Sequence, residues 1–151
     1  MIRLLKKPSL LASSNPFNKG SLNTKLFLGP LICIIAPYKE EEMFRGDLQE
    51  SIKNRLRSFY EDRGLSQISV DILSRITSVF FTSILFGAIH FTNAIFLFCN
   101  PVLLLPQVIA TTVMGIVFGL AKELSGKLNL PIGMHMGNNF LAWASMLNSR
   151  P

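Results

Sequence analysis

The chain has 151 residues, of which 49% are apolar and 16% are charged, below the roughly 25% charged residues typical of soluble globular domains. Fifteen basic residues against nine acidic ones give a net charge of +6. The basic residues do not form a stripe interleaved with aromatic side chains, so this charge does not indicate nucleic-acid binding. Residues 76–151 carry only four charges, at Lys122, Glu123, Lys127 and Arg150. Such a stretch cannot cover itself with a solvated surface, so we expect an integral membrane protein.

The N-terminal part combines basic charge with an interrupted apolar run. Residues 1–25 carry basic residues and no acidic one, which predicts a flexible basic tail on the cytoplasmic side of a membrane domain over 26–149. The first apolar run contains Pro30 and Pro37 and is too short to cross a bilayer. A membrane helix here must therefore run over 26–45 and include charged residues. We expect this polar-ended helix to enter the membrane without crossing it fully.

An amphipathic helix is predicted directly after this segment. Apolar side chains recur every four residues between charged ones, at Phe44, Leu48, Ile52, Leu56 and Tyr60. This period is typical of a helix with one apolar face, which lies at the membrane interface or covers the spans. Gly64 ends the pattern.

Three later stretches are long enough to cross a membrane, since a span needs about 20 residues. Spans are predicted at 76–98 and 102–121, which carry no Asp, Glu, Lys or Arg and are separated by the turn-forming pair Asn100–Pro101. A polar loop at 122–127 precedes a third uncharged span at 128–149. The expected fold is thus an all-α polytopic membrane helical bundle. It has three clear transmembrane helices, a fourth polar-ended membrane helix and an interfacial amphipathic helix.

Polar residues form three groups in or beside these apolar helices, where ionisable side chains are costly and indicate function. In chain order the groups are Glu40, Glu41 and Arg45, then His90, and then His135 with Asn139. Partners four positions apart share a helix face. Two carboxylates, two histidines and an amide are the groups needed to activate a water molecule and to donate hydrogen bonds to an oxyanion.

Each group also has a purely structural interpretation. The carboxylates beside Arg45 can form an interfacial charge network, and His90 can be a hydrogen-bonded packing residue. His135 and Asn139 can link two membrane helices. The joint occurrence of all three groups, which include both histidines of the chain, favours a catalytic site.

The order and spacing of these residues resemble the CPBP family, which comprises CAAX prenyl protease 2 and the bacteriocin-processing Abi-type intramembrane proteases. The family's motifs are E-E-x-x-x-R, F-x-x-x-H and H-x-x-x-N on successive membrane helices. Here they fall on Glu40, Glu41 and Arg45, on Phe86 and His90, and on His135 and Asn139. The neighbouring Ala-Pro and Phe-Arg-Gly sequences are also typical, and the resemblance covers about residues 30–145.

The resemblance implies an intramembrane endopeptidase acting on a membrane-associated substrate, prenylated or of the bacteriocin type. It implies that Glu40 is the general base that activates water and that His90 holds and polarises this water. His135 and Asn139 would stabilise the tetrahedral intermediate. The implied role of Arg45 is to pair with Glu41 and fix the carboxylates, because an unpaired buried charge is costly.

The resemblance leaves the cofactor open. The family is also described as metalloproteases, and Glu40, His90 and His135 would be the ligands if zinc is bound. The chain has no H-E-x-x-H motif, so the usual zinc-protease signature is absent. We rank metal-free water activation ahead of a zinc mechanism.

Several features depart from the family pattern. Lys39 stands where a small or apolar residue is common, and only residues 1–25 precede the first membrane helix, whereas most members carry further helices there. The chain is therefore expected to be a minimal member, a fragment, or one that completes its cavity as a homo-oligomer. The main rival function is a catalytically silent immunity or scaffold protein of the same fold. A small transport subunit that uses the polar groups as a proton path is a third interpretation.

The expected partners are the lipid bilayer and a peptide or lipidated-protein substrate, and no nucleic acid. The expected location is the bacterial inner membrane, as a multi-pass protein.

Overall fold

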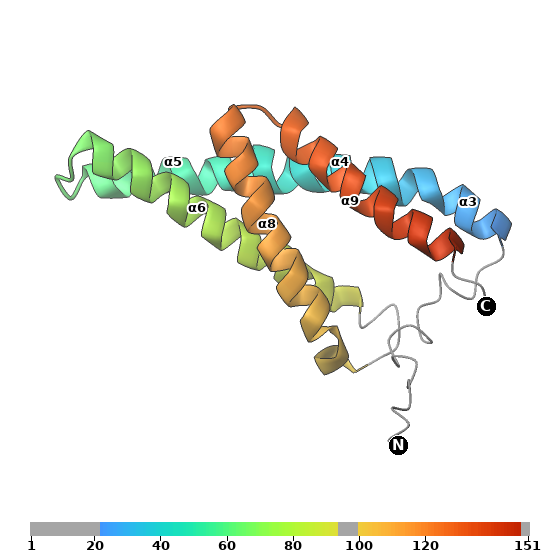
Figure 1. Ribbon diagram of the computed structural model, residues 1–151. Coiled ribbons are helices and arrows are strands. Elements are labelled where there is room, and N and C mark those ends of the chain that lie inside the picture. Colours follow the sequence, from blue (N-terminus) through green and yellow to red (C-terminus); the bar gives the residue numbers. More distant parts are fainter. Residues whose placement is uncertain (1–21, 94–99, 149–151) are drawn as a thin grey trace, which may run out of the picture.

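The computed structural model describes residues 22–93 and 100–148, and this part of the chain forms helices joined by short turns, with no strand in it (Figure 1). The all-α class predicted from the sequence is confirmed. The residues of the predicted tail before Leu22 lie outside the described part.

A continuous helical segment opens the fold. Its five parts, in chain order, are α3 (Leu22–Pro30), the π-helical turn η1 (Leu31–Ile35), α4 (Ala36–Glu41), a second π-helical turn η2 (Glu42–Leu48) and α5 (Gln49–Glu61). The polar-ended helix and the amphipathic helix, predicted as two elements, are therefore one element with two widened turns. Such turns are rare and frequently occur at functional sites.

The first π-helical turn has a cause in the sequence. Pro37 has no backbone N–H, and a proline ring inside a helix crowds the carbonyl of the residue four positions earlier. In the structure the N–H of Ala36 bonds the carbonyl of Leu31, five positions earlier. In this register the carbonyl of Ile32 faces residue 37, which has no N–H to donate.

The other helices follow after tight turns. They are α6 (Gln67–Ile89), the 3-10 turns η3 (His90–Thr92) and η4 (Pro101–Leu104), α8 (Leu105–Ser125) and α9 (Asn129–Asn148). Gly64 and Gly126, with φ of 71° and 66°, supply the left-handed turns after α5 and α8. In Figure 1, α6 returns along α5, and α9 lies beside α3 and α4.

Two predicted boundaries are wrong. α6 begins at Gln67 rather than residue 76, because its first turns bury Val70 and Ser74 against the neighbouring helix α5. α8 ends at Ser125 rather than residue 121, so Lys122 and Glu123 are helical instead of lying in a loop. Ion pairs to α5, described below, satisfy these two charges.

α6 and α8 approach closely because small side chains line their contact. On α6 the buried small residues are Ser74, Ser78, Thr82, Ser83 and Gly87, and on α8 they are Gly115, Gly119 and Ala121. A Cβ atom on Gly87 would overlap Oγ1 of Thr112 and lie 2.9 Å from the carbonyl oxygen of Val108. At this point the backbone of α6 therefore packs directly against the side chain of Thr112 on α8.

Among the residues that the structure describes, two helices are long and apolar enough to cross a membrane, Gln67–Thr92 and Leu105–Ser125. Both expose large apolar side chains on their outer faces. α9 is not one of them, and three polar residues, His135, Asn138 and Asn139, lie in its middle. The third and fourth membrane helices stay a prediction.

Candidate active site

Glu40 and Glu41 end α4, but their carboxylates have different surroundings. Glu41 is fully buried, whereas Glu40 keeps 36% of its side chain exposed. Adjacent helix positions are about 100° apart around the axis, so the two side chains leave the helix in different directions. Only one of the two carboxylates is therefore accessible.

Glu41 connects the first helical segment to α9. Its Oε1 lies 2.9 Å from Nδ1 of His135, which carries the hydrogen of this bond because a carboxylate oxygen accepts. Its Oε2 lies 3.4 Å from Nε of Arg45, and both of these side chains are fully buried. The predicted pairing of Glu41 with Arg45 is confirmed.

The guanidinium of Arg45 lies in a space that small residues of α6 and α8 leave open. Nη1 donates to Oγ1 of Thr82 at 3.3 Å, and the guanidinium carbon lies 5.3 Å from the centre of the Phe86 ring. A Cβ on Gly115 would lie 3.1 Å from Nη2. Loss of either partner would leave the other charge buried and unpaired, which is strongly destabilising. The contacts of the guanidinium therefore hold Arg45 next to Glu41.

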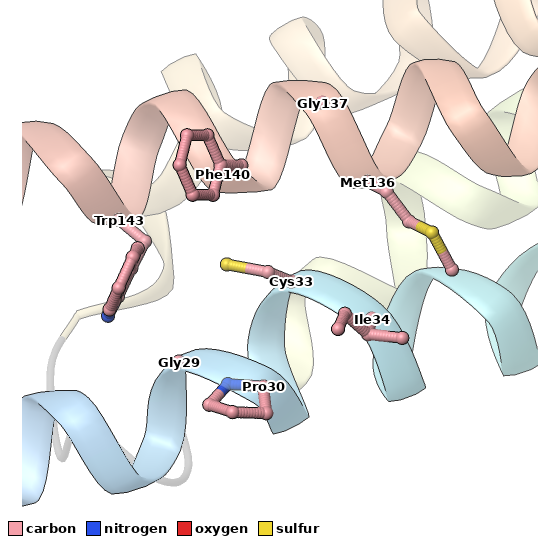
Figure 2. A pocket seen from close by; sticks show the side chains of 8 residues that line it. All are labelled: Gly29, Pro30, Cys33, Ile34, Met136, Gly137, Phe140 and Trp143. Atoms are coloured by element: carbon pink, nitrogen blue, oxygen red, sulfur yellow. The ribbon is translucent and has the colours of Figure 1, made fainter.

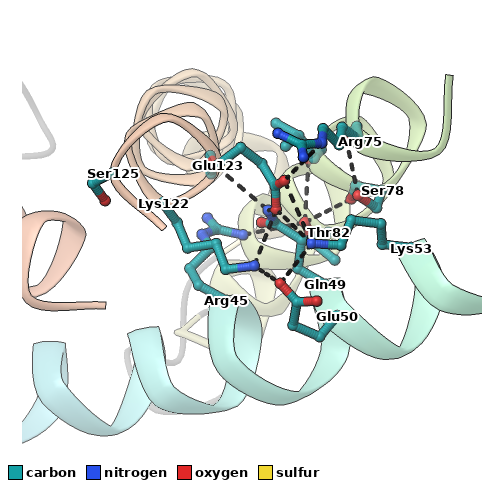
Figure 3. A network of polar contacts seen from close by, with 12 residues as sticks. Arg45, Gln49, Glu50, Lys53, Arg75, Ser78, Thr82, Lys122, Glu123 and Ser125 are labelled. Atoms are coloured by element: carbon teal, nitrogen blue, oxygen red, sulfur yellow. Dashed lines mark hydrogen bonds and ion pairs between the residues drawn. The ribbon is translucent and has the colours of Figure 1, made fainter. Parts of the chain in front are cut away.

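A network of polar contacts lies close to Arg45, between α5 and α8 (Figure 3). Gln49 is buried and donates to Glu123 of α8 at 3.0 Å. Lys53 lies 3.3 Å from the same carboxylate, and Lys122 pairs with Glu50. The network ties α5 to α8 and so anchors the segment that carries both glutamates.

His135 lies between the two carboxylates. Its Nε2 is 3.8 Å from Oε2 of Glu40, on the opposite side of the ring from Glu41. The ring stacks on Phe118 with centroids 5.1 Å apart and meets the edge of Phe86 at 5.8 Å. Both the position and the tilt of this imidazole are therefore fixed by contacts.

His90 begins η3, directly after α6, and lies near the end of the candidate span Gln67–Thr92. Its Nδ1 lies 2.8 Å from the carbonyl oxygen of Phe86. Because a carbonyl only accepts, Nδ1 carries the hydrogen, and Nε2 of the neutral ring has a free lone pair. His90 can thus accept a hydrogen bond from water.

A polar cavity of about 390 Å³ brings the accessible groups of the three motifs together. Its lining includes Glu40, His90, His135 and Asn139, while Glu41 and Arg45 lie behind this wall. Sequence reasoning did not assign the other polar residues of the lining a role: Asn93, Gln107, Thr111 and Asn138. The available signal was a pair of polar side chains four positions apart, Gln107 and Thr111, in a predicted span without charged residues.

Partial burial changes the titration of Glu40. Glu40 lies outside both candidate spans, and its burial raises the pKa of its carboxyl above the usual value, while His135 and His90 oppose the shift. A carboxylate with a raised pKa accepts a proton more readily, as a general base requires.

Asn139 makes two contacts. Its Nδ2 donates to the carbonyl of Ile32 at 3.0 Å, and its Oδ1 accepts from Asn138 at 3.2 Å. These two contacts assign the amide nitrogen and oxygen to their positions. One N–H of the amide remains for a ligand in the cavity that Asn139 lines.

A separate apolar groove of about 380 Å³ lies between α3, η1 and α9 (Figure 2). Cys33 faces Phe140 and Trp143 across it, and Ile34 lies opposite Met136. Trp143 lines both this groove and the polar cavity, and its Nε1 donates to the carbonyl of Lys25 at 3.0 Å. Its ring therefore separates an apolar compartment from a polar one.

The residues considered as zinc ligands do not form a metal site in this structure. No group of three His, Cys, Asp or Glu residues that could hold a metal ion occurs in 22–93 and 100–148. Nδ1 of His90 bonds a carbonyl and Nδ1 of His135 bonds Glu41, which leaves Nε2 as the ring nitrogen that either histidine could offer to a metal. A catalytic zinc site usually has three protein ligands, so this donor set does not fit one.

Comparison with known proteins adds one match. A family model described as Rce1-like, type II CAAX prenyl endopeptidase Rce1-like, matches residues 22–141. No curated protein and no solved structure matches the chain significantly. The matched range contains all the residues of the three motifs.

Proposed function

Because the chain belongs to the Rce1-like family of type II CAAX prenyl endopeptidases, we propose that it is an intramembrane endopeptidase. Its substrate in this proposal is a membrane-associated peptide or protein, with a prenylated C-terminal peptide as the first candidate. One observation carries the proposal: an accessible carboxylate and two histidines from three separate segments line a single cavity.

Glu40 is the general base in this proposal. Glu41 cannot take the role, because its side chain is fully buried and its carboxylate is paired with His135 and Arg45. Nε2 of His90 accepts a hydrogen bond from the attacking water molecule and orients it. Glu40 takes one proton of the water as the water oxygen bonds to the scissile carbonyl carbon.

The carbonyl oxygen then becomes an oxyanion and needs hydrogen-bond donors. The free N–H of Asn139 and the Nε2–H of a protonated His135 supply them. When the C–N bond breaks, the proton on Glu40 passes to the leaving amine, and the other product is the carboxylic acid. This step uses only the chain's own side chains and water.

The charge balance of the cluster supports a protonated His135. Two ionised carboxylates, Glu40 and Glu41, face two cations, Arg45 and the imidazolium of His135. The group has no net charge, which limits the cost of placing it in a low-dielectric region. A neutral His135 would leave an uncompensated negative charge there.

The test is hydrolysis of a fluorogenic peptide that ends in a prenylated CAAX sequence, by the purified full-length chain in lipid nanodiscs. We expect cleavage on the C-terminal side of the modified cysteine, identified by mass spectrometry, and none with the Glu40→Gln variant. Peptides without the prenyl group test whether the lipid is required. A folded protein that binds the peptide but never cleaves it would instead favour the silent scaffold function.

A further inference from the structure

The amide of Asn139 reaches a backbone carbonyl that the first helical segment leaves free. We infer that Pro37 is a positioning residue: by withholding a backbone N–H, it reserves the Ile32 carbonyl as the acceptor that fixes Asn139 in the polar cavity. The inference deepens the proposed function, since Asn139 is one of the proposed oxyanion donors.

The first step concerns the register of the helix. At η1 the backbone bonds run over five positions, as the bond from Ala36 to the carbonyl of Leu31 shows. The next bond of the same register would join residue 37 to the carbonyl of Ile32. Pro37 cannot make it. A buried or half-buried carbonyl without a partner is costly, so this position needs a donor from another element.

The second step concerns the donor. Nδ2 of Asn139 lies 3.0 Å from the Ile32 oxygen, although the two residues are 107 positions apart. The bond holds α9 against η1 and uses one N–H of the amide. Asn138 occupies the Oδ1 atom. The plane of the amide is thus set by two contacts, which fixes the direction of the second N–H before a ligand arrives.

The consequence concerns the rate. A preorganised donor stabilises an oxyanion without reorganisation during the reaction, and removal of one such donor typically lowers kcat by about 10²- to 10³-fold. Pro37 touches neither the water nor the peptide in this mechanism. It acts through Asn139, so its effect depends on that side chain.

The decisive variant is Pro37→Ala, which supplies the missing N–H and lets the backbone compete for the Ile32 carbonyl. We expect kcat to fall about tenfold with an unchanged KM, and Asn139→Ala to lower kcat by about 10²-fold. The double variant is expected to be no slower than Asn139→Ala alone, because coupled effects do not multiply. Pro131→Ala is the matched control. This variant also removes a fully buried proline ring. Pro131 lies in the first turn of α9, where backbone N–H groups have no carbonyl partner within the helix.

A second measurement does not depend on activity. Asn139→Ala is expected to lower the thermal unfolding midpoint with Pro37 present and by about half as much or less in the Pro37→Ala background, where the new N–H satisfies Ile32. Equal losses in the two backgrounds would overturn the inference whatever the activity. If Pro37→Ala kept full kcat while the midpoint loss from Asn139→Ala was smaller in its background, the inferred effect of Pro37 on the rate would be wrong. A wild-type chain that cleaves no peptide would contradict the proposed function alone, since the midpoints still decide whether Pro37 fixes the amide.

Discussion

Nδ1 of His135 lies 2.9 Å from Oε1 of Glu41, across 94 positions of the sequence. This bond joins the first motif to the last and places the imidazole between a buried carboxylate and an accessible one. Glu41 therefore acts on the reaction through His135, whereas Glu40 is left to meet the water. The adjacent glutamates have separate tasks, and the following predictions test that division together with the packing that supports it.

Glu40→Gln is expected to lower kcat by about 10²- to 10⁴-fold, because it removes a proton acceptor but little volume. Glu42→Gln is the matched control. Its carboxylate pairs with Lys39 at 2.8 Å on the exposed side of the helix, and kcat is expected to change less than about twofold. Initial rates of peptide cleavage in nanodiscs measure both. If Glu42→Gln lowered kcat while Glu40→Gln kept full activity, Glu40 would not be the general base.

Removal of metal ions is expected to leave the activity intact, because the described donors do not gather into a three-ligand group. The measurement is the cleavage rate after dialysis against a chelator, with the metal content determined by mass spectrometry. Loss of activity that returns with added zinc would contradict the metal-free mechanism. It would also make Nε2 of His90 the first ligand to test.

Arg45→Met is expected to lower the free energy of unfolding by about 3–5 kcal/mol, because it leaves the Glu41 carboxylate buried without its cation. Arg57→Met removes a pair with the same spacing and residue types, Arg57 with Glu61, together with the pair of Arg57 with Asp71, but both pairs are exposed. Their joint loss is expected to cost less than about 2 kcal/mol. Unfolding in mixed micelles, followed by circular dichroism, measures both. Equal losses would mean that burial of the Glu41 pair contributes nothing.

Gly87→Ala is expected to destabilise the protein by about 1–3 kcal/mol, since its Cβ would overlap Thr112 and push α6 away from α8. Gly133→Ala adds the same methyl group where nothing lies within 4 Å. In the α9 helix this change is expected to be neutral or stabilising by up to about 1 kcal/mol. The unfolding midpoints of the two variants separate contact from helix propensity. A stabilised Gly87→Ala would contradict the close approach of α6 and α8.

The topology can be tested by labelling single cysteines in intact cells, in a background with Cys33→Ala and Cys99→Ala. The turn after α5 and the turn after α8 are predicted to be cytoplasmic, because basic residues concentrate in cytoplasmic loops. Asp62→Cys and Lys127→Cys are therefore expected to react with an impermeant thiol reagent only after lysis. Val102→Cys, at the opposite end of α8, is expected to react in intact cells. The reverse pattern would invert the predicted orientation.

Local periodicity was sufficient for much of the fold and for part of the site. The four-residue spacing placed Glu41 and Arg45 on one helix face, the family resemblance implied that they pair, and the structure confirms the pair. The length of uncharged sequence located the cores of α6 and α8. These features depend on residues close together in the chain, where helix geometry alone sets the distances.

Contacts between distant segments could not be predicted in the same way. Nothing local indicates that Asn139 meets Ile32, because the free carbonyl arises only when Pro37 widens the turn before it. Gln107 and Thr111 were missed because their approach to the cavity depends on how α8 crosses α6. α9 is also not apolar enough to be identified as a membrane span, because the polar residues that it brings to the site lower its mean hydropathy.

The widened turns around α4 have a consequence for how chain length can vary in this protein. A π-helical turn holds one residue more than an α-helical turn, so deletion of one residue from η1 would restore α-helical winding. The helix before the deletion would then keep nearly the same rotational phase relative to α4, because the wider turn uses one residue more for the same rotation. If the deleted residue lies between Ile32 and Pro37, Ile32 would lie four positions before the proline, and its carbonyl would still lack a backbone N–H. A deletion at Gly64 instead shortens the turn between α5 and α6, the helix that leads to His90, so a single-residue deletion is expected to be tolerated better in η1 than in this turn.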